Sequence, residues 1–424
     1  MPSTLSERDL KVIWHPYTRQ KDMPPALPLV RGEGALLFDE NGKAYIDATS
    51  SWWVNIHGHA HPYIAESIYR QALQLEHVIF AGYTHEPAVR LAERLLPLLP
   101  GSPGRIFYSD NGSTAVEVSL KMAIQYWWNR GVRRRRLLAF RHSYHGDTFG
   151  AMSVSERGVF TVAFQDYLFE VAFIDTPTAV NLDALQDQIR AHGPETAAFI
   201  YEPLLQGAGG MRMYEAAHLD VLLETCRSEG ILCIADEVMT GFGRTGKLFA
   251  SEYTEHKPDI VCLSKGITGG TMALGVTACS DAVYQAFVDD DKLKTLFHGH
   301  SFTANPITCA AALASLDLLE DPACADRRQR IHRQHLAFAE RLRAIPLATN
   351  VRVLGTVLAF DVATGAGYLD NVGPLIARYS IERGIMLRPQ GSNVYVLPPY
   401  CITEEQLEAI YGCIEGALGE LKTR

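Results

Sequence analysis

The sequence lacks cysteines that are spaced as metal ligands. Its 424 residues contain eight cysteines, at positions 226, 233, 262, 279, 309, 324, 401 and 413. None of them forms a C-x-x-C pair, and several lie inside apolar runs, where a thiol packs as a small hydrophobic side chain. This pattern predicts free thiols and no metal site. Free thiols in an enzyme-sized chain predict a reducing compartment, so we expect a cytoplasmic location.

Long apolar runs and an excess of positive charge are also absent. No uninterrupted apolar stretch approaches the ~18 residues that span a bilayer, and the N-terminal MPSTLSERDLKVIWHPYT lacks the apolar centre of a signal peptide. The formal net charge of −9 argues against a general nucleic-acid binder. The one basic run, residues 133–136, is interpreted as a solvated connector. We therefore expect neither nucleic acid nor a membrane as a partner.

The middle of the chain alternates apolar, strand-like runs with helical patterns. Buried-looking runs separated by helices are typical of a mostly parallel sheet that is covered on both faces. The sequence thus predicts an α/β fold with such a sheet at its centre. The expected strands are residues 105–110, 137–140, 197–203, 231–238, 259–265 and 275–280, and a helix is expected from Ser113 to about Asn129.

The last quarter of the chain has a different texture. From about residue 310 a long charged helical stretch leads to two expected strands, IMLRPQ and NVYVLPP, joined by Gly391 and Ser392. This indicates a smaller α+β domain. We expect an N-terminal segment (1–60) that joins the small domain, a large domain (61–310) and the small domain itself (311–424).

Ionisable residues fall repeatedly at the carboxyl ends of the expected strands. Ligands collect at this edge of a parallel sheet, and several such groups in one chain favour a functional cleft. The residues concerned are Asp110, Glu202, Asp236, Glu237 and Lys265.

Two other motifs are interpreted as coincidental. GFGRTGK (241–247) satisfies G-x-G-x-x-G, but it begins three residues after a strand, and Leu248 stands where a nucleotide loop needs Ser or Thr. HGHAHP brings His57, His59 and His61 together without ordered thiolate or carboxylate ligands, so a polar turn is favoured over zinc.

Four features of the sequence suit one ligand. Small residues start the helix after Asn111, as in a phosphate cradle, although a plain helix cap explains them equally well. Tyr144 could stack on a flat ring, with Val238 on the opposite face, and Asp236 ends a strand. Lys265 stands alone beyond an apolar run. A pyridoxal 5′-phosphate site needs all four, with the lysine bonded to the aldehyde and the carboxylate paired with the ring nitrogen.

The motifs resemble fold-type I pyridoxal-phosphate enzymes, and class III aminotransferases in particular, over nearly the whole chain. The segments that carry the resemblance are IWHPYT (13–18), SSWW (50–53), YHGDTFGAMSV (144–154), QGAGGMRMY (206–214), ADEVMTGFGRTGKLFA (235–250), SKGITGG (264–270) and LRPQGSNVYVLPPY (387–400).

The resemblance implies roles for individual residues. It assigns catalysis to Lys265, Tyr17 and Asp236. It assigns cofactor binding to Gly112, Ser113, Tyr144, Asp236, Val238 and Lys265, together with His300 and Ser301 of a loop that completes the neighbouring subunit's site. Substrate contacts are implied for Tyr17, Trp52, Tyr144, Asp147, Lys265, Gly299 and Tyr395, with Asp147 supporting Tyr17 or the amine and Arg388 binding a carboxylate in bidentate fashion. A homodimer with shared active sites follows from the exchanged loop.

Within the class, the motifs are most similar to the biotin-synthesis enzymes that convert 8-amino-7-oxononanoate to 7,8-diaminononanoate. The paired Trp52 and Trp53 favour S-adenosylmethionine as amino donor, whereas HGHS (298–301) resembles relatives that use lysine. An ω-amino-acid:pyruvate aminotransferase or an aminomutase is the alternative with the same fold. Alternatives of other classes are a nicotinamide-dependent oxidoreductase and a non-catalytic regulator, and the latter lacks a basic DNA-binding segment here.

Overall fold

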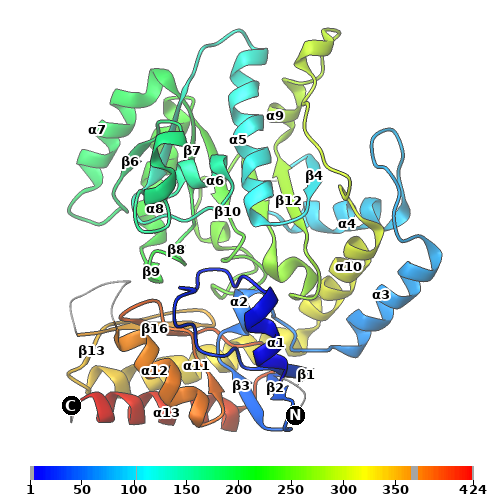
Figure 1. Ribbon diagram of the computed structural model, residues 1–424. Helices are drawn as coiled ribbons and strands as arrows, with labels where there is room; N and C mark the ends of the chain where they lie inside the picture. The colour runs from blue at the N-terminus through cyan, green and yellow to red at the C-terminus, as the bar shows by residue number, and fades with distance from the viewer. Residues whose placement is uncertain (1–3, 102, 364–370, 423–424) are drawn as a thin grey trace.

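The computed structural model describes residues 4–101, 103–363 and 371–422. A large α/β part fills the upper half of the view in Figure 1, and the C-terminal helices and a smaller sheet lie below it. Within the described residues, no helix is both long and apolar enough to cross a membrane.

The large part is built on a seven-stranded sheet. Its order is β4 (Arg105–Ser109), β12 (Gly275–Cys279), β11 (Ile260–Leu263), β10 (Leu232–Asp236), β7 (Thr196–Tyr201), β5 (Arg136–Phe140) and β6 (Ala172–Ile174). Only β12 runs antiparallel to its neighbours, β11 and β4, so the predicted mostly parallel sheet is confirmed.

Side chains of the central strands alternate between two hydrophobic cores. Ile200 and Ile234 pack on the side of α5 (Gly112–Asn129) and α6 (Phe149–Val154). Phe199, Tyr201 and Cys233 point the other way, toward α7 (Leu182–His192) and α8 (Ala216–Ser228). Successive side chains of a strand face opposite sides, so a strand covered on both faces is apolar throughout. The strands therefore read as continuous apolar runs in the sequence.

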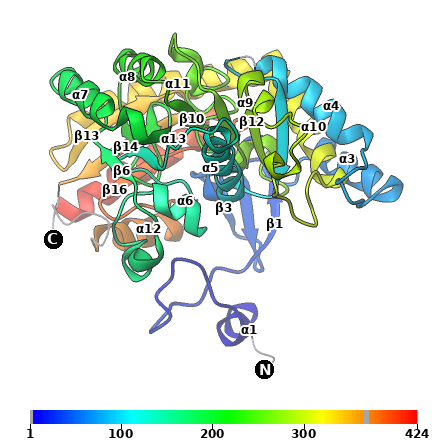
Figure 2. The same ribbon diagram turned by 90° about the horizontal axis from the view of Figure 1, so that it is seen from above.

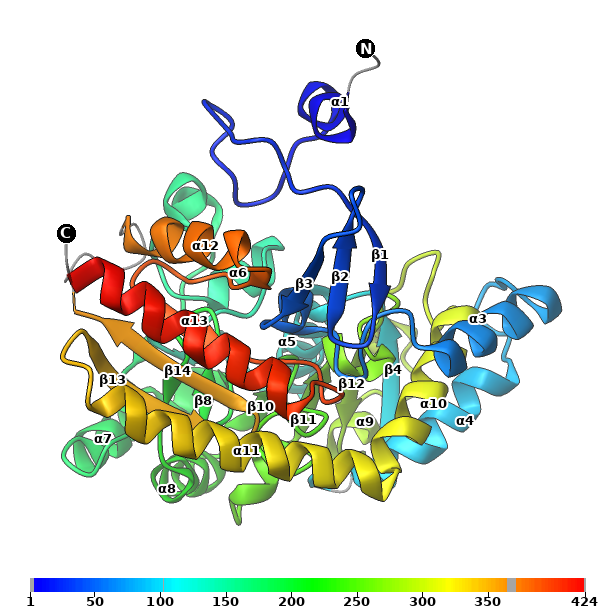
Figure 3. The ribbon, with the colours of Figure 1, turned by 90° about the horizontal axis from the view of Figure 1, so that it is seen from below.

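The smaller part contains two further sheets. One is antiparallel, in the order β13 (Ala348–Leu354), β14 (Val357–Val362) and β16 (Asn393–Val396). It is accompanied by α11 (Pro322–Arg343), α12 (Val372–Glu382) and α13 (Glu404–Lys422), and Figure 3 shows α11 and α13 along it. The other joins the N-terminal strands β1 (Leu29–Glu33), β2 (Leu36–Asp39) and β3 (Ala44–Asp47) to β15 (Ile385–Met386).

The remaining elements connect and cover these sheets. The helices are α1 (Leu5–Val12), α2 (Ser50–Trp53), α3 (Pro62–Gln74), α4 (Glu86–Leu95), α9 (Asp281–Gln285) and α10 (Pro306–Glu320). A two-stranded ribbon pairs β8 (Leu205–Gln206) with β9 (Arg212–Met213). Short 3₁₀ turns are η1 (Leu96–Leu98), η2 (Val162–Tyr167), η3 (Gly193–Glu195), η4 (Ala250–Tyr253), η5 (Lys265–Thr268) and η6 (Lys292–Lys294). Figures 2 and 3 show α1 standing apart from the rest of the molecule.

The two expected C-terminal strands belong to different sheets. β15 pairs in parallel with β3, whereas β16 pairs with β14, and only an isolated bridge joins Gln390 to Asn393. Both expected strands are present, but β15 covers only Ile385–Met386, so the connection to β16 is longer than the expected Gly391 and Ser392. The division into domains stays a prediction. We propose to place its second boundary after α10, because α10 spans residue 310 and packs on α3 and α4.

The basic run at 133–136 is less solvated than expected. Arg134 donates to the carbonyl oxygens of Thr196, Glu229 and Gly230, and its guanidinium lies 4.0 Å from the Trp127 ring centroid. The run does connect α5 to β5, but the Arg134 side chain is less solvated than expected, because it ties three chain segments together.

The two coincidental motifs have structural explanations. Arg244 of GFGRTGK is buried and donates to the carbonyl oxygens of Trp53, Asn55 and Pro398. The described residues contain no group of three ligands that could hold a metal ion. His57 lies 3.1 Å from the Ser315 hydroxyl, and burial lowers its pKa to about 3.

Candidate active site

A hollow of about 810 Å³ opens at the carboxyl ends of the central strands. It lies at the edge where the strand-end rule places ligands. Among the strand-end residues, Glu237 does not line the hollow. Its lining includes every residue outside the 299–301 loop to which the family resemblance assigned a role: Tyr17, Trp52, Gly112, Ser113, Tyr144, Asp147, Asp236, Val238, Lys265, Arg388 and Tyr395.

The N-terminus of α5 forms one end of the hollow. Asn111 caps the helix by accepting from the Thr114 N–H at 3.0 Å, and the Thr114 hydroxyl accepts from the Asn111 N–H at 3.1 Å. The first N–H groups of a helix have no intrahelical acceptor, and the helix dipole adds positive potential there. A Cβ on Gly112 would lie 2.8 Å from Val238 Cγ1, so only glycine lets the helix start lie this close to Val238. This arrangement suits a phosphate group.

Lys265 projects into the hollow from a turn. It begins η5, two residues beyond β11, and its φ of 49° lies in the left-handed region. The expectation that the lysine belongs to the end of the strand is corrected accordingly. Its Nζ lies 5.1 Å from the Trp53 ring centroid. Burial lowers the pKa of this amine, against the opposing effect of Asp236 and Glu202, so the neutral nucleophile becomes more accessible.

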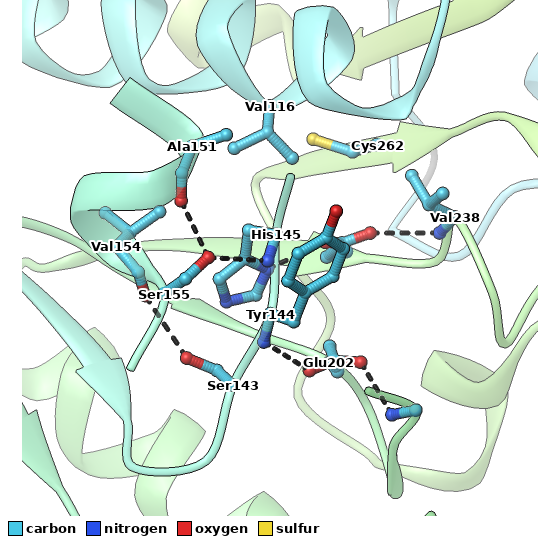
Figure 4. A network of polar contacts seen from close by, with 12 residues as sticks. Val116, Ser143, Tyr144, His145, Ala151, Val154, Ser155, Glu202, Val238 and Cys262 are labelled. Atoms are coloured by element: carbon cyan, nitrogen blue, oxygen red, sulfur yellow. Dashed lines mark hydrogen bonds and ion pairs between the residues drawn. The ribbon is translucent and has the colours of Figure 1, made fainter. Parts of the chain in front are cut away.

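Asp236 ends β10 and is almost fully buried. One carboxylate oxygen accepts from the Val238 N–H at 3.0 Å, and the other lies 2.7 Å from His145 Nδ1. His145 is itself held through its backbone N–H, which donates to the Ser155 hydroxyl at 2.9 Å (Figure 4). These bonds fix the direction of the carboxylate within the hollow.

Tyr144, Tyr17 and Asp147 are hydrogen-bonded to one another. The Tyr17 hydroxyl lies 3.2 Å from that of Tyr144 and donates to the Asp147 carboxylate at 2.5 Å. Burial, followed by the bond to Tyr17, raises the pKa of the Tyr144 phenol. The Tyr144 hydroxyl therefore stays protonated in the neutral range, while the Tyr17 hydroxyl donates its hydrogen bond to Asp147.

The lining of the hollow also contains aromatic rings and a cation. The Arg388 guanidinium lies 3.8 Å from the Trp52 ring centroid, and the Trp53 indole N–H donates to the Tyr395 hydroxyl at 3.1 Å. Tyr17 and Trp52 meet edge to face, with centroids 5.6 Å apart. An arginine stacked on a ring keeps its donors free for a carboxylate.

The tryptophans stand on a backbone segment that is bent by buried polar groups. Ser50, Ser51 and Trp53 all have positive φ values. The Asp47 carboxylate accepts from the Ser51 N–H at 2.7 Å, and the Ser50 hydroxyl donates to the Leu397 carbonyl at 2.8 Å. Such conformations persist where the surroundings hold them, as they do here.

The 299–301 loop does not line the hollow of its own chain. Gly299 and Ser301 are exposed, and the His300 ring nitrogen Nδ1 accepts from the Phe302 N–H at 3.2 Å. The structure therefore brings together the predicted residues of one subunit, and the roles of these three residues stay predictions.

The residues of the hollow fit pyridoxal 5′-phosphate. The Gly112 cradle has the donors that a phosphate needs, Lys265 provides an amine for the aldehyde, and the Asp236 carboxylate can pair with a protonated ring nitrogen.

Three residues of the site had no predicted role. Phe160 lies 5.6 Å from Tyr17 and 6.3 Å from Tyr144 between ring centroids, but it belongs to no helix or strand, so no periodic pattern indicates it. The sequence indicated Glu202 as a carboxylate at a strand end, and it indicated His145 as the neighbour of Tyr144. Their roles follow only from the contacts of the folded chain.

Comparison with known proteins agrees with this geometry. The family model "Aminotransferase class-III" matches residues 17–418. The chain is 47% identical over 422 residues to the adenosylmethionine-8-amino-7-oxononanoate aminotransferase of Synechococcus elongatus, covering 96% of this chain and 99% of that protein.

Two solved structures share the fold. One, the adenosylmethionine-8-amino-7-oxononanoate aminotransferase of Methanocaldococcus jannaschii, has a TM-score of 0.95, 33% identity and 98% coverage of both chains. The other is an amine transaminase of an uncultivated Pseudomonas species in a PLP-bound form, with a TM-score of 0.89, 30% identity and coverage of 96% of this chain and 98% of that chain. The chain belongs to the class III aminotransferases, which depend on pyridoxal 5′-phosphate, as its motifs predicted.

Proposed function

We propose that this chain transfers an amino group to the 7-keto group of 8-amino-7-oxononanoate, giving 7,8-diaminononanoate in biotin synthesis. We infer S-adenosylmethionine as the donor. Support comes from the full-length similarity to proteins whose names state both substrates. A cytoplasmic location stays a prediction from the cysteine pattern.

One observation carries the proposal. The same hollow contains the Lys265 amine and the Arg388 guanidinium, together with the aromatic rings of Tyr17, Trp52 and Phe160. The acceptor is a straight apolar chain with a keto group and an amine at one end and a carboxylate at the other. Such a molecule needs a reactive amine, an apolar wall and a cation for its carboxylate, and this hollow offers all three.

When bound, pyridoxal 5′-phosphate supplies an aldehyde for the incoming amine and a ring that takes up the electrons of the broken C–H bond. Lys265 Nζ accepts the proton that leaves the donor's α-carbon. Its lowered pKa keeps more of the amine neutral, and only the neutral amine can accept this proton. In the second half-reaction the same amine returns a proton to the former keto carbon. Asp236, held by His145 and the Val238 N–H, provides the carboxylate for the ring nitrogen.

The substrate side is assigned to the remaining residues. Arg388 binds the acceptor's carboxylate, while Trp52 and Tyr395 line its apolar stem and exclude water. The hydroxyl oxygens of Tyr17 and Tyr144 lie near the amine, and Asp147 orients Tyr17 by accepting its hydroxyl proton. These roles are proposals that rest on the lining of the hollow.

We infer a homodimer in which Gly299, His300 and Ser301 complete the phosphate site of the partner subunit. The loop is exposed and does not line its own hollow. It is flanked by Phe297 and Phe302, whose side chains are 69% and 61% exposed. Large apolar side chains beside a polar loop favour burial against a second copy.

The test is to follow each half-reaction of the holoenzyme by the absorbance of its cofactor. We expect S-adenosylmethionine to convert the cofactor to its amino form, and 8-amino-7-oxononanoate to convert it back with formation of 7,8-diaminononanoate, detected by mass spectrometry. Lysine in place of S-adenosylmethionine should leave the spectrum unchanged. Conversion by lysine would assign the donor suggested by HGHS, and reoxidation by pyruvate alone would identify an ω-amino-acid enzyme.

A further inference from the structure

Glu202 occupies a central place in the site without a role in the reaction described above. It follows β7 directly, and the register of Tyr201 with Ala235 puts it beside Asp236 of β10. On the other side of β7 lies β5, whose following loop carries Tyr144 and His145. The Glu202 carboxylate therefore stands between the two segments that supply the cofactor-facing residues.

Each carboxylate oxygen of Glu202 holds one backbone N–H. Oε1 accepts from Tyr144 at 3.0 Å, and Oε2 accepts from Gly207 at 2.9 Å (Figure 4). Neither amide lies in a strand of the central sheet, so neither has a ladder partner. A Cβ on Gly207 would lie 3.2 Å from Trp53, which shows how closely this backbone packs on the indole ring. One side chain thus sets the spacing between the Tyr144 loop and the Trp53 wall.

Keeping a carboxylate here is costly. Glu202 is 5% exposed, and the described residues place no lysine or arginine at ion-pair distance from it. A buried charge without a cation destabilises the fold unless strong hydrogen bonds compensate. The two backbone N–H groups that Glu202 accepts supply this compensation, and its side chain lines the hollow, so the acid in this position calls for a functional explanation.

We propose that Glu202 is a positioning residue for transamination, whose carboxylate holds Tyr144 and the Gly207 backbone in register around the reacting centre. The inference rests on the proposed aminotransferase function. A neutral side chain at this position could accept only one of the two bonds well, which would release one of the two loops.

The brace depends on pH. Burial, reinforced by Asp236, raises the pKa of Glu202 to about 7, while His145 and the two amide bonds oppose the shift. Lys265 and the buried Tyr214 also face this carboxylate. The folded protein therefore holds the Glu202 proton below about pH 7 and loses it above. Both amides are bound most strongly in the ionised form, so the brace tightens as pH rises through this value.

The test compares Glu202→Gln with Glu237→Gln. Glu237 is also a buried strand-end carboxylate, and it accepts from the backbone N–H groups of Ala250 and Ser251, but it does not line the hollow. We expect both variants to bind cofactor, and only Glu202→Gln to lower kcat, by roughly 100-fold for a loop displaced by about 1 Å. Glu202→Gln should also lose the limb of the pH–kcat profile centred near 7. An unchanged limb, or equal losses in both variants, would overturn the proposal.

A second measurement uses the unmodified protein and needs no substrate. In protein labelled with ¹⁵N-tyrosine, the Tyr144 amide resonance is identified by its loss in Tyr144→Phe. We expect this resonance to titrate with a midpoint near pH 7, and a constant shift between about pH 5.5 and 8.5 would refute the brace. If none of the tested donors reacts, the proposed function fails while this titration still decides the role of Glu202.

Discussion

Arg388 is the residue whose replacement should separate the two substrates. Its guanidinium rests on Trp52 in the lining of the hollow and is proposed to bind the acceptor's carboxylate. A charge-assisted hydrogen bond contributes about 1.5–3 kcal/mol, so Arg388→Ala should raise KM for 8-amino-7-oxononanoate by about 10- to 100-fold. Single-turnover rates with each substrate measure this effect, and we expect the donor half-reaction to change little.

A matched control is available in the same part of the chain. Arg383 also stacks on a ring, with its guanidinium 3.4 Å from the Tyr379 centroid, but it does not line the hollow. Arg383→Ala should leave both half-reactions as they are. Equal slowing of both half-reactions by Arg388→Ala would instead indicate a general effect on the site.

For single residues, the sequence predicts site residues that lie at strand ends. It misses residues that reach the site only through tertiary contacts. Asp236 and Lys265 follow apolar runs, so their place at the carboxyl edge is readable from local pattern. Tyr17 was assigned only through family resemblance, because nothing in its neighbourhood indicates a contact with Asp147, 130 positions away. Phe160 was indicated neither by a strand-end position nor by the family resemblance. Sequence distance hides such contacts, and only the packed chain reveals them.

Among the elements, α5 is the one whose start most directly shapes the cofactor site. A Cβ on Gly112 would meet Val238 Cγ1 at 2.8 Å and Cγ2 at 3.3 Å, and a β-branched side chain has little freedom to move away. Overpacking of this kind costs about 1–3 kcal/mol. We expect Gly112→Ala to weaken cofactor affinity by at least about tenfold, measured by equilibrium dialysis of pyridoxal 5′-phosphate.

Gly419 is the control for this substitution. It lies in α13, and a Cβ there would meet nothing within 4 Å. Gly419→Ala should leave cofactor affinity unchanged and raise the free energy of unfolding by up to about 1 kcal/mol, because alanine is the better helix former. A Gly112→Ala variant with normal cofactor affinity would show that the start of α5 can shift away from Val238 at little cost. That result would contradict the proposal that this helix start binds the phosphate.

Elements were predictable where local chemistry marks their ends. The helix expected from Ser113 to about Asn129 is α5, Gly112–Asn129, because its cap residues and apolar face are both local signals. Pairing between elements is not local. The segments around Ile385 and Val396 were rightly expected as strands, yet their partners, β3 and β14, come from opposite ends of the chain.

For the whole molecule, the proposal to be tested is a dimer whose two chains share their sites. The large-domain fold and the family follow from patterns spread along the sequence, but the order of the seven strands does not, since it depends on long connections. The position of the 299–301 loop outside its own hollow is a property of the folded chain. Together with the exposed Phe297 and Phe302, it makes the dimer the unit in which catalysis should be tested.

Two inactive variants should restore activity in one another. Lys265→Ala removes the catalytic amine and keeps a normal loop, whereas Ser301→Glu keeps the amine and places a negative charge where the partner's phosphate is proposed to bind. In a mixed dimer, one site combines both defects, and the other combines the intact Lys265 with the intact loop.

Random pairing makes half of the dimers mixed, and each has one of two sites intact, so refolding an equal mixture should recover about one quarter of wild-type activity. Each variant refolded alone should remain inactive. If the loop served its own subunit, every site in the mixed dimer would carry one defect, and no activity would return. Measurement of turnover after co-refolding, with size-exclusion chromatography to verify dimers, therefore distinguishes a shared site from two independent ones by the presence or absence of a signal.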